Sequence, residues 1–194
     1  MNILFGVLVV LLAVLFAKAK FLSFRAQSSQ NYGQTNPVFL INKHLSGDLL
    51  SEGVVFGPNG RVTNSFVAKM AGTWDGDTGD GDTGTLSEDF VYSNGRTQSR
   101  KWFLTLGQNN SFTATAADIV GTARGTMSGS TIKMTYKITL PKESGGHTLT
   151  AIDWLYLTQD GVVINRSELR KFGIKVAELV ATIRPVENAP DQKT

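Results

Sequence analysis

The segment TIKMTYKITL, residues 131–140, alternates between apolar and polar side chains without a break. Its even positions carry Ile132, Met134, Tyr136, Ile138 and Leu140, and its odd positions carry threonine or lysine. Alternation with a period of two indicates a strand with one buried face and one solvated face, as in antiparallel sheets. Residues 61–74 show the same alternation, with apolar side chains on most even positions. These stretches predict an all-β protein.

Short turn signals separate the predicted strands. Residues 58–61, 93–96 and 159–162 each contain Asn-Gly or Asp-Gly, the dipeptides typical of hairpin turns. About eight to ten strands fit between residues 47 and 184, and no long amphipathic helix interrupts them. Such a chain closes into an up-and-down antiparallel barrel or packs as a sandwich, and closure removes exposed strand edges.

The hairpin at residues 93–96 can be tested for register. A two-residue loop at Asn94-Gly95 pairs Glu88 with Lys101 and Asp89 with Arg100, which gives two opposite-charge pairs. Neighbouring positions of a strand point to opposite faces of its sheet. One of the two pairs is therefore expected to point inward and to mark a polar spot in a cavity. The alternative places both pairs near a rim.

Composition limits the classes of function. The chain has 194 residues, 41% of them hydrophobic, with a net charge of +3 and no cysteine. This length and hydrophobic content predict one domain with a hydrophobic core. The scattered basic residues argue against nucleic-acid binding. The lack of cysteine excludes disulfides, thiolate metal sites and cysteine nucleophiles.

The N-terminal segment is strongly apolar. Residues 3–17 carry no charge, and their length is nearer to that of a secretory signal than to the roughly 20 residues of a membrane-spanning helix. Residues 17–19, Ala-Lys-Ala, resemble a cleavage site, whereas the basic residues that follow favour a cytoplasmic body. We expect residues 1–22 to be a signal or membrane-anchor helix, with the body outside the cytoplasm. The alternative is a buried core helix.

The remaining chain divides into three parts. Residues 23–36 are polar and lack periodicity, which predicts a linker. Residues 37–185 form the predicted barrel domain. Residues 186–194 carry few apolar side chains, which predicts a flexible tail.

The sequence DGDTG occurs twice, at residues 75–79 and 80–84. A calcium loop of the EF-hand type needs oxygen ligands at positions 1, 3 and 5 and a glutamate at position 12. Starts at Asp75, Asp77 and Asp80 all fail this test. Four carboxylates could still hold a cation weakly. We favour a copied hairpin turn, because lengthening a loop costs little free energy. No metal site and no cofactor is predicted.

Several motifs together are similar to those of one family. GTWDGDTG, TLSEDFVYSNG, RKWFLTL, ADIVGTARG, DWLYL and INRSELRKFG occur in the order and spacing of the bacterial family catalogued as domain of unknown function 3833. The resemblance covers roughly residues 39–184 and implies a lipocalin-like barrel in the bacterial cell envelope, inner-membrane anchored or periplasmic. Many members carry a lipid-bearing cysteine, which this chain lacks. Genes of this family often lie near genes for fatty-acyl-modifying enzymes, and the resemblance therefore implies a loose link to membrane lipids.

Asp153 is the most unusual polar residue of the predicted core. It shares the odd face of residues 147–157 with three leucines and an alanine. A carboxylate among apolar side chains needs a partner or a raised pKa, and Arg166 is the predicted partner. The pair is interpreted as structural, as ligand-orienting, or as part of a catalytic site. Asp118 is expected to cap a turn, and His44 and His147 are expected on the surface.

The candidate ligand-binding residues are those that an inner barrel face could present. They are Trp74, Glu88, Phe90, Lys101, Trp102, Tyr136, Asp153, Trp154 and Arg166. Aromatic residues on strands either pack a core or line a cavity for an apolar ligand. No serine–histidine–aspartate arrangement, phosphate loop or glutamate pair is evident. We therefore favour a binder or carrier of an apolar, fatty-acyl or lipid-like ligand. The alternatives are a structural or partner-binding protein and an enzyme using Asp153.

Overall fold

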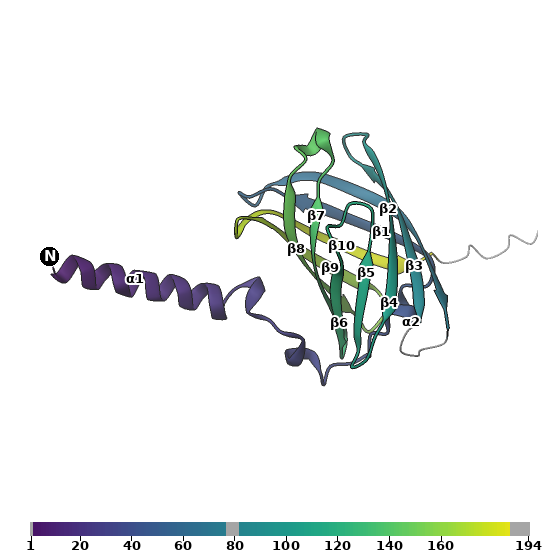
Figure 1. Ribbon diagram of the computed structural model, residues 1–194, viewed down its shortest axis with the longest axis horizontal. Helices are drawn as coiled ribbons and strands as arrows, with labels where there is room; N and C mark the ends of the chain where they lie inside the picture. The colour runs from purple at the N-terminus through teal and green to yellow at the C-terminus, as the bar shows by residue number, and fades with distance from the viewer. Residues whose placement is uncertain (1, 77–81, 187–194) are drawn as a thin grey trace, which may run out of the picture.

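The computed structural model describes residues 2–76 and 82–186 and shows a closed antiparallel barrel (Figure 1). Within these residues the strands are β1 (Gly47–Phe56), β2 (Val62–Asp75), β3 (Thr83–Tyr92), β4 (Thr97–Leu106), β5 (Ser111–Thr115), β6 (Ala123–Ser128), β7 (Thr131–Thr139), β8 (Thr148–Leu157), β9 (Val163–Lys171) and β10 (Ile174–Pro185). Each strand pairs with its neighbour in sequence, and β1 also pairs with β10. The predicted all-β barrel is confirmed, and the sandwich is excluded.

The alternation noted in β7 sets which side chains enter the barrel. Met134 of β7 lies opposite Asp153 of β8, and Tyr136 lies opposite Ala151. The even residues of β7 and the odd residues of β8 therefore share the inner face. Asp153 lies on this face, as predicted.

The β3–β4 hairpin corrects the predicted register. The Tyr92 N–H donates to the Arg96 carbonyl at 2.9 Å, so the loop contains three residues and ends at Gly95, whose φ is +81°. A three-residue loop with a left-handed glycine is a common hairpin connection. It pairs Glu88 with Arg100, and the predicted pairs Glu88–Lys101 and Asp89–Arg100 are wrong.

That shift of one residue decides which charges lie inside. Lys101 now pairs with Ser87 on the outer face, whereas Arg100 points inward with Glu88. The expectation of one inward ion pair is correct, but its basic member is Arg100.

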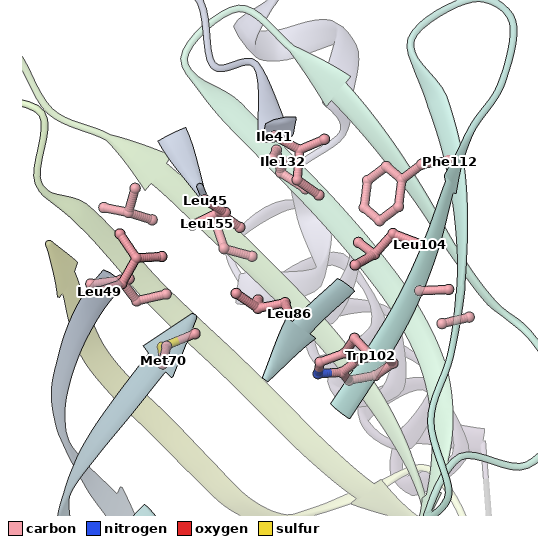
Figure 2. Packing of buried hydrophobic residues seen from close by; sticks show 14 of the residues in the cluster. Ile41, Leu45, Leu49, Met70, Leu86, Trp102, Leu104, Phe112, Ile132 and Leu155 are labelled. Atoms are coloured by element: carbon pink, nitrogen blue, oxygen red, sulfur yellow. The ribbon is translucent and has the colours of Figure 1, made fainter. Parts of the chain in front are cut away.

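One end of the barrel is closed by a plug formed by residues 39–45, which include the short helix α2 (Ile41–His44). Phe39, Ile41 and Leu45 are at most 3% exposed. The Trp74 indole N–H donates to the Leu45 carbonyl at 3.0 Å. Figure 2 shows Ile41 and Leu45 among the core side chains enclosed by the strands.

The N-terminal helix α1 (Asn2–Phe21) extends away from the barrel (Figure 1). Its large apolar side chains from Ile3 to Phe16 are about half exposed or more. Among the helices within the described residues, none combines the length and apolarity needed to cross a membrane.

Residues 23–36, predicted as a linker, lie against the outside of the barrel, and we call them the N-terminal strap. They include η1 (Phe24–Ala26) and η2 (Ser29–Tyr32). The Gln27 Oε1 accepts hydrogen bonds from Tyr32 and from Tyr156 of β8, at 2.7 and 2.8 Å. The Ser128 hydroxyl donates to the Ser29 carbonyl at 2.6 Å. The strap therefore fixes the chain that follows α1 to the barrel wall.

Two predictions fall partly outside the described residues. The repeated DGDTG spans the connection between β2 and β3, whose last described pair is Asp75 with Thr83. Residues 77–81 of the repeat, and residues 187–194 of the predicted tail, lie outside the described part of the chain. A further short helix, η3 (Lys142–Ser144), lies in the β7–β8 connection.

Candidate functional site

The inside of the barrel contains a partly open cavity of about 140 Å³. Most of its wall is apolar and includes Leu86, Leu104, Phe112, Ile132 and Leu155. The polar side chains on the wall are Ser51, Glu88, Arg100, Tyr136, Asp153, Asn165 and Ser167. An apolar space with a few convergent polar groups is the usual form of a small-molecule site.

Arg100 of β4 is the centre of the polar group. Its Nη2 and Nε donate to Asp118 Oδ2 at 2.7 and 3.0 Å. Its Nη1 lies 3.6 Å from Glu88 Oε2, and its guanidinium lies 5.6 Å from the Trp102 ring centroid. Asp118 lies in the β5–β6 connection. It binds the Arg100 guanidinium in a bidentate manner, which is the strongest geometry for a carboxylate–arginine pair.

Glu88 of β3 is enclosed beside Arg100. Its side chain is 12% exposed. Burial raises the pKa of Glu88 to about 7, although the Arg100 charge and the Trp102 indole N–H favour the charged form. Its Oε2 has no hydrogen-bond partner within the described residues.

Asp153 of β8 is the second buried carboxyl group. The residue is 7% exposed, and the Tyr136 hydroxyl donates to its Oδ2 at 2.9 Å. Burial raises the pKa of Asp153, and the Ser167 and Tyr136 hydroxyls and the Arg100 charge oppose that shift. Its Oδ1 has no hydrogen-bond partner among the described residues.

The structure brings five of the predicted site residues together on the cavity wall. They are Glu88, Phe90, Trp102, Tyr136 and Asp153. Trp74 lies at the plugged end, with its indole directed to the Leu45 carbonyl. Arg100 and Asp118 join the polar group although neither was among the predicted binding residues. Asp118 was expected only to cap a turn.

Three predicted site residues lie on the outside of the barrel. Lys101 is exposed beside Phe103, with its Nζ 5.6 Å from the ring centroid. Trp154 is covered by the N-terminal strap, where its ring centroid lies 5.3 Å from that of Tyr32. Arg166 pairs with Glu178 of β10. The predicted Asp153–Arg166 pair is therefore wrong, because adjacent strands place these side chains on opposite faces.

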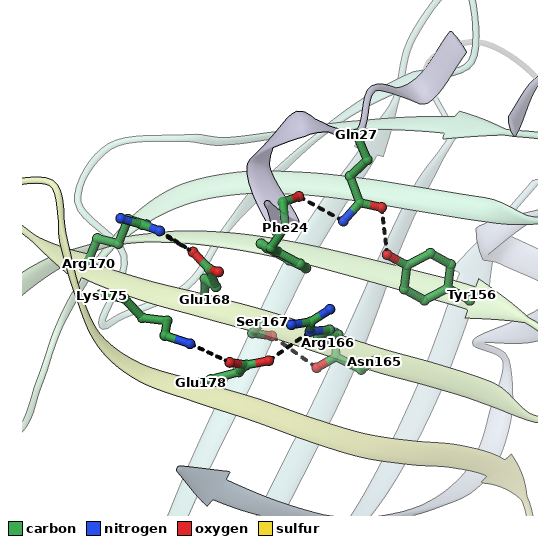
Figure 3. Close-up of polar contacts among 10 residues, drawn as sticks. All are labelled: Phe24, Gln27, Tyr156, Asn165, Arg166, Ser167, Glu168, Arg170, Lys175 and Glu178. Carbon is green, nitrogen blue, oxygen red and sulfur yellow. Dashed lines mark hydrogen bonds and ion pairs between the residues drawn. The ribbon is translucent and has the colours of Figure 1, made fainter. Parts of the chain in front are cut away.

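The outer-face ion pairs are well matched (Figure 3). Glu178 accepts from Arg166 Nε at 2.7 Å and from Lys175 Nζ at 2.8 Å. The Arg166 guanidinium also lies 4.8 Å from the Phe24 ring centroid. Burial raises the pKa of Glu178, but the Lys175 and Arg166 contacts outweigh it and lower that pKa below its usual value.

Metal binding finds no support in the part of the chain that the structure describes. No group of three or more histidine, cysteine, aspartate or glutamate side chains in that part is arranged to hold a metal ion.

The chain belongs to the family described as Protein of unknown function (DUF3833), whose model matches residues 19–185. This confirms the resemblance inferred from the motifs. No match was found among the curated proteins.

Two solved structures show the same fold. The S-type phycobiliprotein lyase CPES from Guillardia theta is 9% identical, with a TM-score of 0.56 over 77% of this chain and 92% of the lyase. Rv2717c from M. tuberculosis is 14% identical, with a TM-score of 0.50 over 79% of this chain and 100% of that protein. At these identities the likeness shows the fold alone.

Proposed function

We propose that the barrel is a binding module for a small, largely apolar ligand that carries one polar group. The observation that supports this most directly is the cavity inside the barrel, whose apolar wall is interrupted by Glu88, Arg100, Tyr136 and Asp153. A ligand with an apolar body and a polar end matches both parts of that wall.

The cluster of polar side chains on the cavity wall is difficult to explain by its contribution to stability alone. Removing charges from water is costly, and well-packed apolar residues of similar volume often serve a core equally well. The group also leaves Glu88 Oε2 and Asp153 Oδ1 without hydrogen-bond partners among the described residues. Unsatisfied buried acceptors weaken a fold. This supports a binding role over a purely structural one.

The cavity volume limits the size of the ligand. A volume of about 140 Å³ is below the ~300–1,000 Å³ of typical drug-sized sites. A short acyl or alkyl chain, or the end of a longer one, suits this space, and each buried methylene contributes about 0.8 kcal/mol. A lipid-like ligand is our specific proposal, and a whole long chain would require the barrel to widen.

An enzyme is the second candidate, and Glu88 is the observation that favours it. A carboxyl group with a pKa of about 7 can take up and release a proton near neutral pH. Asp153, held by Tyr136, provides a second carboxyl group on the same wall. Binding remains the better-supported function, because the apolar wall and the polar side chains together match a ligand with an apolar body and one polar end.

For the location of the protein, we propose the cell envelope, with residues 3–17 as export signal or membrane anchor and the barrel outside the cytoplasm. The exposed apolar side chains of α1 support this. The β9–β10 turn lies on the side of the barrel from which α1 extends (Figure 1), and its Phe172 is 93% exposed. A phosphatase reporter that works only after export, fused at the C-terminus, should be active. A silent reporter would contradict this location.

The binding proposal is tested by mass spectrometry of the full-length protein purified from its native membrane. We expect a small apolar molecule in roughly stoichiometric amount under conditions that keep the protein folded. Recovery of no bound molecule, together with no binding of short-chain probes, would contradict the proposal.

A further inference from the structure

Two carboxyl oxygens on the cavity wall lack hydrogen-bond partners among the described residues, and this restricts the kind of polar group that a ligand can carry. Glu88 Oε2 and Asp153 Oδ1 are buried to less than 1 Å² and have no hydrogen-bond partner within the described residues. Both atoms are acceptors when the carboxyl groups are charged. A buried acceptor without a donor is energetically unfavourable, so both positions favour a ligand that supplies N–H or O–H groups.

The charges of the wall point in the same direction. Among the described residues that line the cavity, Arg100 is the only cation, and two carboxyl groups, Glu88 and Asp153, accompany it. Asp118 adds a third carboxyl group that contacts Arg100. When the acidic groups are charged, the cluster is net negative and attracts a cation.

The guanidinium of Arg100 is already engaged. Its Nε and Nη2 donate to Asp118, and its Nη1 faces Glu88. A ligand carboxylate could not use the Nε–Nη2 edge of the guanidinium, because Asp118 already occupies it. It would also approach two like-charged groups, which costs free energy.

We propose that the cavity selects an alkylammonium ligand, an amine with an apolar body whose N–H groups donate to Asp153 Oδ1 and Glu88 Oε2. This inference rests on the proposed binding function and specifies its ligand class. It excludes the carboxylate of a free fatty acid from the polar end of the cavity.

The test compares three probes of equal chain length, octylamine, octan-1-ol and octanoate, titrated into the full-length protein. Binding is followed by NMR of ¹³C-labelled methionine methyl groups, because Met70 and Met134 line the cavity. We expect octylamine to bind at least about tenfold more tightly than octanoate, as hydrogen bonds to charged groups are the stronger ones. Octan-1-ol should lie between them.

The variant Asp153→Asn keeps the shape of the side chain and removes its charge. It should weaken octylamine binding at least about tenfold and change octan-1-ol binding by less than about threefold. Asp89→Asn is the matched control, because Asp89 neighbours Glu88 on β3 and bonds Ser99 on the exposed face. It should change neither affinity.

The outcomes separate this inference from the function on which it rests. Equal binding of the three probes, tighter binding of octanoate, or an unchanged octylamine affinity in Asp153→Asn would each overturn the alkylammonium assignment and leave a binding barrel. If no probe shifts the Met70 or Met134 signals and no molecule co-purifies, the binding function fails as well.

Discussion

Glu88 and Glu178 are the same residue type beside an arginine, but they lie on opposite faces of one barrel wall. Inside, Glu88 is 3.6 Å from Arg100, and burial raises its pKa to about 7. Outside, Glu178 bonds Arg166 and Lys175 at 2.7 and 2.8 Å, and those contacts lower its pKa despite partial burial. Desolvation outweighs charge pairing on the inner face, and pairing outweighs desolvation on the outer face.

The difference shows how to distinguish a site from ordinary surface electrostatics. The outer glutamate satisfies its oxygens with partners that solvent also reaches, and such pairs contribute little to stability. The inner glutamate keeps an oxygen without a hydrogen-bond partner among the described residues. A position that is unfavourable for folding and faces a cavity is a candidate for binding or catalysis.

The largest contrast is expected from the two arginines. Arg100→Met leaves Glu88, whose side chain is 12% exposed, and Asp118, whose side chain is 24% exposed, without their cation, and should lower the free energy of unfolding by about 3–5 kcal/mol. Arg166→Met removes an outer pair whose arginine is 44% exposed, and should cost at most about 1 kcal/mol. Urea unfolding of both variants measures the difference. Equal losses would show that the inner pair is no more buried in solution than the outer one.

The pH dependence of stability should have opposite signs for the two glutamates. The folded protein keeps a proton on Glu88 between its usual pKa of 4.5 and about 7, so its contribution to stability falls as pH rises through this window. Asp153, whose pKa is also raised, acts in the same direction. The contribution of Glu178 is present above 4.5 and is lost as pH falls below it.

Urea unfolding at several pH values tests this sign. Glu88→Gln should remove much of the decline between pH 4.5 and 7, a change on the order of a few kcal/mol. Glu178→Gln should leave that window unchanged. A wild-type stability that rises across the window would contradict the raised pKa of Glu88.

Two tyrosines provide a smaller contrast. Tyr136→Phe removes the hydroxyl that donates to buried Asp153, and should cost about 1–3 kcal/mol. Tyr156→Phe removes a hydroxyl that donates to Gln27 of the strap, and should cost less than about 1 kcal/mol, because Gln27 Oε1 keeps the Tyr32 hydroxyl. Thermal and urea unfolding measure the stability of both variants. A larger loss of stability in Tyr156→Phe than in Tyr136→Phe would contradict the assignment of Tyr136 to the inner face.

The smallest effect is expected from the repeated DGDTG. Deleting one copy should change the free energy of unfolding by less than about 1 kcal/mol, because loop closure depends weakly on loop length. Calorimetric titration with calcium should show no binding tighter than about millimolar. A micromolar calcium site that disappears with the deletion would disprove the copied-turn interpretation.

The sequence predicted the barrel because its signals are local. The alternation in β7 specifies which face is buried, and the Asn-Gly and Asp-Gly turns mark where strands end. The strap could not be found in this way. Gln27, Tyr32 and Phe24 pack against side chains more than 100 residues away, and polar short segments carry no periodicity that reveals such contacts.

The site was predicted only in part, and one loop explains much of the error. The alternation of side chains along the strands correctly placed Asp153 and Tyr136 on the inner face. The two-residue loop assumed at Asn94-Gly95 put Lys101 opposite Glu88, whereas the three-residue loop puts Arg100 there. A slip of one residue exchanges the two faces of a strand. The predicted Asp153–Arg166 pair did not take this alternation into account, since Arg166 lies opposite Trp154 on the outer face.

The most direct test of a ligand site inside the barrel is a crystal structure of the full-length protein with octylamine. We expect the alkyl chain between Leu86, Leu104 and Ile132, and the nitrogen within about 3 Å of Asp153 Oδ1 or Glu88 Oε2. Octylamine bound only outside the barrel, or seated with its nitrogen toward the α2 plug, would contradict the account.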